Sequence, residues 1–183
     1  GGNIESDDFK ELLLRWFQFG TFCPVMRIHG CRQPYTNLKN KAGEVREGTG
    51  ADNEVWSYGE DAEKIMVKFI HVRELMKDYI RGIMKEAHEK GTPVMRTLFY
   101  EFPDDNCWDI YDEYMFGNEI LVAPICHEHE TRREVYLPKG HSWTSAHNGE
   151  VYEGGKTYNT DAPIDTIPVF LKDGSNKYLI GEI

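Results

Sequence analysis

The sequence predicts an α/β unit followed by an all-β unit, and three observations support this division. Residues 1–90 contain two long segments with helical hydrophobic periodicity. A mostly apolar run follows from Pro93 to Asp105. Beyond it, short apolar stretches alternate with glycine-containing turns, which is typical of an antiparallel sheet or sandwich. We therefore expect an α/β unit over residues 1–105 and an antiparallel β unit over residues 106–183.

Composition narrows the classes of partner. The 183 residues carry a net charge of −10, and nucleic acids and anionic membranes both require a basic face. No apolar run approaches the roughly 20 residues that a membrane span needs. The polar opening GGNIESDDFK does not have the pattern of a signal peptide. We expect a cytoplasmic protein whose partner is neither nucleic acid nor membrane, and a neutral sugar is compatible with its charge.

The four cysteines, Cys23, Cys31, Cys107 and Cys126, contain no CxxC pair and no histidine at zinc-ligand spacing. His127 and His129 follow Cys126, but one isolated C-H-E-H cluster is more typical of a solvated strand end than of a metal site. We expect reduced cysteines, no metal site and no cofactor.

The first predicted helix begins after Ser6, which suits an N-cap, with Asp7 and Asp8 in the first turn. It ends near Gly20. Its apolar face consists of Leu12, Leu13, Trp16 and Phe17.

A short buried segment is expected to lead from this helix to a tight turn at His29 and Gly30. An arginine and an imidazole at the end of such a segment suit the binding of a polar ligand, which makes Arg27 and His29 candidate ligand-binding residues. The commoner alternative is structural: Arg27 pairs with a core carboxylate, and His29 fills a hydrogen-bonded niche. The residues alone leave both readings open.

Residues 30–56 are polar and lack periodicity, so we expect a long loop, and loops of this length are usually functional or mobile. It leads to Trp56 and Tyr58, which suit either stacking on a sugar or anchoring the next helix. Anchoring is the commoner role.

The longest predicted element is one helix from Glu60 to Lys90, stopped by Gly91 and Pro93. Its apolar stripe follows a spacing of three and four. The stripe contains Ile65, Phe69, Val72, Leu75, Met76, Tyr79, Ile83 and Ala87.

The run Pro93–Asp105 predicts a buried strand, in which Arg96 requires a partner for its charge. Residues 108–116 suit a short helix. Strands are expected over Asn118–Ile125, from Arg133 to Pro138 and over Ile167–Leu171. Turns are expected at Asn148–Gly149, Gly154–Gly155 and Asp173–Gly174.

Three segments in combination resemble glycoside hydrolase family 31, the α-glucosidases and α-xylosidases: RWFQFGTFCPVMRIHG, PVMRTLFYEFPDD and GNEILVAPI. The resemblance implies the closing part of a (β/α)8 barrel, with Pro93–Asp105 as its last strand, followed by an antiparallel β-sandwich domain. It implies retaining hydrolysis of terminal α-linked glucose or xylose from oligosaccharides. It also implies that His29 hydrogen-bonds the sugar in the cleavage subsite and that Arg27 supports that loop.

The resemblance further implies that both catalytic aspartates lie upstream of Gly1. Gly1 and Gly2 match two glycines of the family, while Asn3 replaces a phenylalanine. This chain is therefore expected to be a C-terminal fragment that contains neither the nucleophile nor the acid/base and is inactive alone. The segment NEVWSYGE is similar to xylosidase-like members.

Glu101, Asp104 and Asp105 are the carboxylates of this chain that invite a catalytic reading, but adjacent aspartates usually cap the following helix.

Two other hypotheses remain open. In one, the chain is a non-catalytic carbohydrate-binding module with a stacking platform of Trp56, Tyr58 and Trp143. In the other, it is a folding-defective remnant whose strand edges and apolar helix faces promote aggregation or homo-oligomers.

Overall fold

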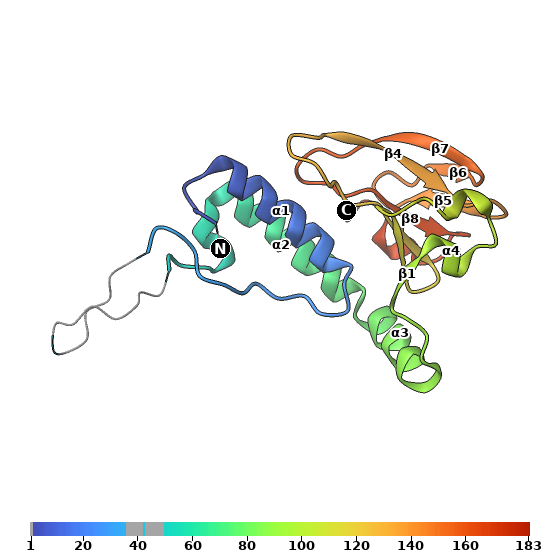
Figure 1. The fold of residues 1–183 in the computed structure, drawn as a ribbon, viewed down its shortest axis with the longest axis horizontal. Coiled ribbons are helices and arrows are strands. Elements are labelled where there is room, and N and C mark those ends of the chain that lie inside the picture. Colours follow the sequence, from blue (N-terminus) through green and yellow to red (C-terminus); the bar gives the residue numbers. More distant parts are fainter. Residues whose placement is uncertain (1, 36–41, 43–49) are drawn as a thin grey trace.

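The structure, a computed structural model, describes residues 2–35, 42 and 50–183. Helices α1 (Asp7–Thr21) and α2 (Glu60–Leu75) lie side by side, and a β-structure occupies the other end of the molecule. Helix α3 (Lys77–Lys90) leads from α2 towards this β-structure (Figure 1). The expected order of a helical unit followed by an antiparallel unit is therefore confirmed.

Helix α1 begins as predicted. The side-chain oxygen of Ser6 accepts a 3.4 Å hydrogen bond from the backbone N–H of Phe9, and so caps one of the free N–H groups of the first turn. Leu13, Leu14 and Phe17 are buried on the face of α1 that belongs to the core shared with α2.

The backbone on either side of α1 forms a parallel pair. The N–H of Ile4 donates to the carbonyl of Gln33 at 3.0 Å, and the N–H of Gln33 donates to the carbonyl of Gly2 at 2.9 Å. A strand end, a helix and a parallel return are the parts of a β–α–β unit. A Cβ at Gly2 would lie 1.9 Å from the Phe9 ring, so only glycine fits there. Gly1 lies outside the described residues.

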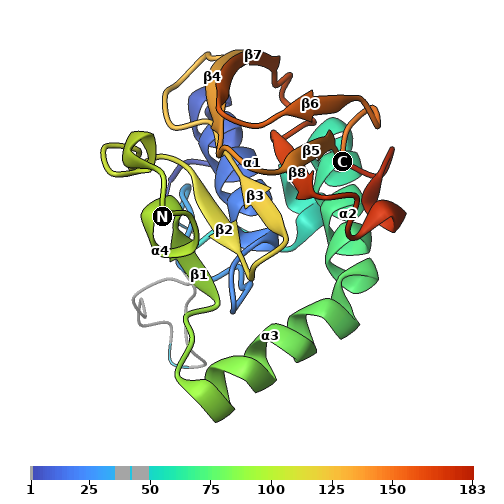
Figure 2. The ribbon, with the colours of Figure 1, turned by 90° about the vertical axis from the view of Figure 1, so that its right-hand side faces the viewer.

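The prediction of one continuous helix from Glu60 to Lys90 is wrong in one respect. The helix is interrupted at Met76, whose φ of −80° and ψ of 0° separate α2 from α3 (Figure 2). Helix α2 buries Phe69 against α1, whereas α3 places Tyr79 on the end of the sheet, where its hydroxyl donates to the carbonyl of Phe116 at 2.7 Å. One straight helix would not satisfy both packing surfaces. Gly91 ends α3 in the left-handed conformation, as predicted.

The predicted strand from Pro93 to Asp105 is also shorter than expected. Strand β1 covers only Met95–Thr97 and is followed by the short helix α4 (Leu98–Glu101) and a 3-10 turn, η2 (Asp105–Cys107). Leu98 and Phe102 are buried while the residues between them face solvent, and a spacing of four suits a helical turn. Strand β1 pairs antiparallel with β2, so the expectation that this run forms the last barrel strand is wrong here.

Residues 108–116 do not form the expected helix. They end in strand β2, and the chain then builds a six-stranded sheet in the order β1-β2-β3-β8-β5-β6, faced by the pair β4-β7. The strands beyond β1 are β2 (Tyr114–Phe116), β3 (Ile120–Val122), β4 (Arg132–Leu137), β5 (Ser142–Ser145), β6 (Val151–Glu153), β7 (Lys156–Asp161) and β8 (Val169–Lys172). Every pairing between them is antiparallel, and the turns at Asn148–Gly149 and Gly154–Gly155 join strands as predicted.

The centre of the six-stranded sheet is buried on both faces. Leu121 and Phe170 point towards β4, where they form one core with Val135 and Trp143. Their strand neighbours, such as Val122, point to the opposite face and join the core of the helices. Alternate side chains of one sheet thus stabilise both halves of the molecule.

Candidate functional site

The segment from Phe22 to Gly30, which carries the two predicted ligand-binding residues, is more exposed than expected. Val25 keeps 77% of its surface accessible, and Arg27 and His29 are exposed. Within the part of the chain that the structure describes, neither Arg27 nor His29 forms a hydrogen bond or an ion pair. The described residues therefore provide neither the core ion pair nor the hydrogen-bonded niche of the structural alternative.

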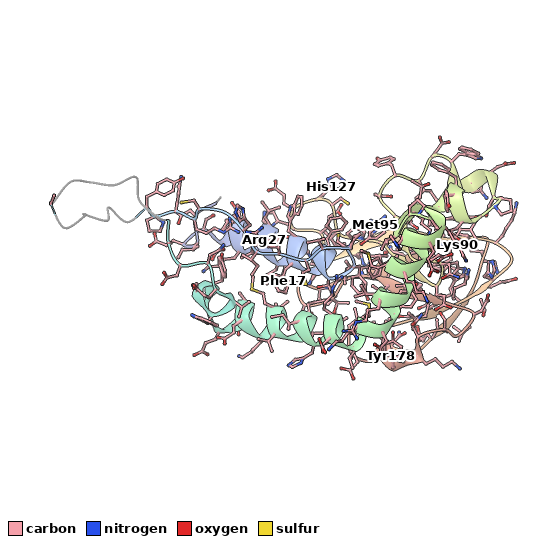
Figure 3. The ribbon with its side chains drawn as sticks, turned by 90° about the horizontal axis from the view of Figure 1, so that it is seen from below. Phe17, Arg27, Lys90, Met95, His127 and Tyr178 are labelled. Atoms are coloured by element: carbon pink, nitrogen blue, oxygen red, sulfur yellow. The ribbon has the colours of Figure 1, made fainter. Side chains whose placement is uncertain are left out.

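Arg27 and His29 line a cavity of about 350 Å³ between α1 and residues 23–32. Figure 3 shows Arg27 beside Phe17 of α1, and both residues belong to this lining. No aspartate or glutamate of the described residues lines the cavity. Its polar groups are basic or neutral, so the cavity offers hydrogen-bond donors but no carboxylate pair for acid/base chemistry.

The backbone at the start of this segment is held by side chains from two other elements. Arg73 of α2 donates to the carbonyls of Thr21, Cys23 and Pro24, at 2.7, 2.5 and 3.0 Å. The hydroxyl of Tyr114 on β2 donates to the carbonyl of Phe22 at 3.1 Å. These contacts are not visible in the sequence, because their acceptors are backbone atoms.

The stacking platform of the carbohydrate-binding hypothesis does not exist in the structure. Trp56 is exposed at 65%, but Tyr58 is buried and accepts a 3.1 Å hydrogen bond from Nε of Arg32. Trp143 lies fully buried between the sheets and donates from Nε1 to the carbonyl of Pro138 at 3.0 Å. Because two of the three rings are buried, they present no stacking face to a sugar.

Two of the three carboxylates that invited a catalytic reading, Glu101 and Asp104, have structural partners, and Asp105 is exposed. Glu101 pairs with Arg96, which also contacts Glu86 at 3.1 Å, so the predicted need of Arg96 for a partner is confirmed. Asp104 is buried, caps η2 and accepts a 2.6 Å hydrogen bond from the hydroxyl of Tyr136. Burial raises the pKa of Asp104, but its hydrogen bonds outweigh burial and lower the pKa below the ordinary value.

One member of the Cys126–His129 cluster, His129, also has a structural partner. The ring of His129 contacts the carboxylate of Glu11 at 2.9 Å. The backbone N–H of His129 donates to the same carboxylate at 2.8 Å. Among residues 2–35, 42 and 50–183, no group of three metal-binding side chains is close enough to hold an ion, and no cysteine forms a disulfide. No helix in this part of the chain is long and apolar enough to cross a membrane.

The sequence analysis missed several buried charged residues, among them Arg15 and Glu113. Arg15, only 8% exposed on α1, donates to four backbone carbonyls of the β unit, those of Glu130, Ala162, Pro163 and Thr166, at 2.9–3.1 Å. Glu113 is 6% exposed, and burial raises its pKa to about 7. One oxygen of Glu113 accepts from the N–H of Tyr136 at 2.9 Å, while the other has no partner among the described residues.

Comparison with known proteins gives consistent matches along the chain. Residues 1–82 match the TIM-barrel domain of glycosyl hydrolases family 31, and residues 91–175 match the C-terminal domain of the same family. Alpha-glucosidase 2 of Bacillus thermoamyloliquefaciens is 40% identical over 175 residues, which are 95% of this chain and 20% of that protein. Alpha-xylosidase of Saccharolobus solfataricus is 32% identical over 182 residues, 99% of this chain and 22% of that protein.

Among solved structures, a GH31 alpha-xylosidase from a soil metagenome, complexed with xylose, superposes with a TM-score of 0.92. It is 44% identical, and the match covers 98% of this chain and 27% of that one. The chain thus spans about a fifth of the length of the curated relatives it matches.

Proposed function

Because this chain belongs to glycoside hydrolase family 31, we propose that it is part of a retaining α-glycosidase that releases terminal α-linked glucose or xylose from oligosaccharides. The relatives named above are an α-glucosidase and α-xylosidases, and they align with almost the whole chain. Within that enzyme, we assign to His29 a hydrogen bond to the sugar in the cleavage subsite and to Arg27 the support of the same loop.

One observation carries the assignment of His29. Its imidazole is exposed and has no hydrogen-bonding partner among the described residues, although it follows a backbone that is firmly held at its start. An imidazole without a structural partner is available to a ligand. Arg27 is exposed in the same way and adds a positive charge close by.

The catalytic carboxylates are proposed to come from outside these 183 residues. Retaining glycosidases need two carboxyl groups about 5–5.5 Å apart, flanking the scissile bond. The cavity beside His29 has no carboxylate in its lining, and Glu101 and Asp104 are bound to Arg96 and Tyr136 away from it. The chain expressed alone should therefore bind sugar weakly and not hydrolyse it.

The first experiment is hydrolysis of an aryl α-glucoside and an aryl α-xyloside by the product of the complete reading frame that contains this chain. Release from either substrate is expected, and the ratio of the two kcat/KM values identifies the preferred sugar. A folded protein that releases neither would refute the proposal.

A substitution then tests the assigned residue. His29→Ala should lower kcat/KM by about 10–100-fold, the value of one or two hydrogen bonds to substrate. His71→Ala is the matched control, because His71 is also exposed but lies on α2 away from the cavity. Equal effects of the two substitutions on kcat/KM would contradict the proposed role of His29 in the subsite.

The division into units near residue 105 stays a prediction, although β1 already pairs with the β unit. Cysteines without disulfides suit the reducing cytoplasm, which we propose as the compartment. Exposed apolar residues on α1, Leu12 and Trp16, suit packing against further protein, either the rest of a barrel or a second copy.

A further inference from the structure

The carbonyl groups at the end of helix α1 need hydrogen-bond donors, and another element provides them. The last turn of a helix has carbonyl groups without an intrahelical partner, and a nearby cation stabilises them. Helix α1 has no basic residue in its last turn. The guanidinium of Arg73, from α2, occupies this place and binds the carbonyls of Thr21, Cys23 and Pro24.

Tyr114 supplies a donor to the one carbonyl of this turn that Arg73 does not reach. Its hydroxyl donates to Phe22, so four consecutive carbonyls, from Thr21 to Pro24, each accept a hydrogen bond from a side chain of another element. Burial raises the pKa of Tyr114 well above its ordinary value, which keeps the hydroxyl protonated as a donor. We call this arrangement, Arg73 and Tyr114 on the four carbonyls, the carbonyl clamp.

The backbone beyond the carbonyl clamp has no such support of its own. From Val25 to His29, no backbone N–H or carbonyl takes part in a hydrogen bond within the described part of the chain. Met26 and Ile28 pack against the core through their side chains, and backbone hydrogen bonds resume at Gly30, whose carbonyl accepts from Asn53 at 3.4 Å. Among the described residues, the hydrogen bonds that fix the direction in which residues 25–29 leave α1 are therefore those of the clamp.

From this geometry we propose that Arg73 and Tyr114 are positioning residues for the sugar-binding His29. Neither residue lines the cavity that contains His29, so both act through the backbone of residues 21–24. The proposal rests on the function proposed above. It adds that the helical unit, through α2, and the sheet, through β2, both determine where His29 is presented.

The three bonds of Arg73 require a planar guanidinium with several fixed donors. Two bonds come from Nη1 and one from Nη2, and a lysine ammonium is a single point charge that cannot reproduce this spread. Arg73→Lys should therefore retain part of the effect, and Arg73→Met, which keeps the length of the side chain, should lose all of it.

The structural half of the proposal is tested on the 183-residue chain by amide hydrogen exchange. The amides of Phe22 and Cys23 donate to Phe19 and Gly20 at 3.0 and 3.2 Å and report on the clamped turn. Arg73→Met should accelerate their exchange by at least about tenfold, because the turn loses its bonds to a charged donor. Arg81→Met is the matched control, because Arg81 makes one exposed 3.5 Å contact with Asp78.

The functional half is tested by a double-mutant cycle in the product of the complete reading frame. Arg73→Met should lower kcat/KM about tenfold in the otherwise unchanged enzyme but less than about twofold when His29 is already alanine. Arg73→Lys should recover part of the loss, and Tyr114→Phe should give a smaller loss with the same dependence on His29.

The outcomes separate the two proposals. Equal losses in both backgrounds, or no loss from Arg73→Met, would overturn the positioning role. Unchanged exchange at Phe22 and Cys23 would overturn the clamp itself. If His29→Ala has no effect on turnover, the sugar-binding role fails, while the exchange measurement still decides whether the clamp fixes the turn.

Discussion

The guanidinium of Arg15 donates a 2.9 Å hydrogen bond to the carbonyl oxygen of Ala162, across 147 positions of sequence. Three further bonds join Arg15 to the carbonyls of Glu130, Pro163 and Thr166. Gln18, one turn later on α1, adds a 2.7 Å bond to the carbonyl of Ile164. A single face of α1 is thereby fixed to the loop that precedes β8 and to Glu130, shortly before β4.

Arg15→Met should destabilise the chain by about 3 kcal/mol, because the substitution removes the donor from four carbonyls in a largely buried interface. Urea unfolding of the 183-residue chain measures this loss. The control Arg81→Met should change the free energy of unfolding by less than about 0.5 kcal/mol, since its ion pair is exposed. Similar effects of the two variants would show that the Arg15 contacts add no stability.

Two glycines with nearly equal φ angles provide a second test. Gly117 has φ of +68° and Gly91 has φ of +71°. Substitution by alanine should therefore cost a similar conformational free energy, about 1 kcal/mol, at each position. A Cβ at Gly117 would also lie 2.2 Å from the hydroxyl oxygen of Tyr79, whereas a Cβ at Gly91 meets no atom within 4 Å.

Gly117→Ala should therefore cost about 2–4 kcal/mol and Gly91→Ala about 1 kcal/mol, as measured by thermal or urea unfolding. Adding Tyr79→Phe to Gly117→Ala should recover part of the difference, because it removes the closest oxygen. A larger cost at Gly91 than at Gly117 would contradict the packing described for α3.

Glu113 should make the stability of the chain depend on pH. Burial raises its pKa from 4.5 to about 7, so the folded state holds the proton more tightly than the unfolded state. The contribution of protonated Glu113 to the free energy of unfolding is fully present below pH 4.5 and is lost as the pH rises through about 7. The separation of the two pKa values corresponds to about 3 kcal/mol.

Glu113→Gln keeps an oxygen that accepts from the N–H of Tyr136 but cannot ionise. Its unfolding free energy should therefore show less decline between pH 4.5 and 8 than that of the unmodified chain. Urea titrations at several pH values measure the two curves. Parallel curves would mean that Glu113 titrates normally in the folded chain.

Asp104 should show the opposite dependence on pH. Its hydrogen bonds lower its folded pKa below 3.8, so the stability it adds is present above that value and is lost as the pH falls through the folded pKa. Asp104→Asn should cost about 1–3 kcal/mol at pH 7 and less at pH 3. The exposed neighbour serves as control: Asp105→Asn should have little effect at either pH.

The sequence was informative where a local signal decides the structure. Ser6 caps α1 and Gly91 ends α3, because capping depends on one side chain or one backbone angle. No glycine or proline marks the interruption at Met76 in the sequence. It results from packing of α2 on α1 and of α3 on the sheet. The run after Thr97 was misread as strand, since a short apolar stretch fits either period until its neighbours are known.

The candidate site was predictable to a similar extent. The binding roles of His29 and Arg27 stay predictions from a family resemblance, and both residues line one cavity in the structure. Arg73 and Arg15 were missed because each binds main-chain carbonyls, and any residue type can provide those acceptors. Long-range contacts of this kind leave no pattern in the sequence of either partner.

The interruption at Met76 also governs how the chain tolerates changes of length. Successive side chains of an α-helix are rotated by about 100°. One residue inserted after Met76 would leave α2 in place but rotate the apolar side of α3, so that Tyr79 and Ile83 turn away from Phe116. An insertion of a whole turn would restore the rotation and shift α3 by about 5.4 Å along its axis. Natural variation in length is therefore expected in the loop after α3 rather than at Met76.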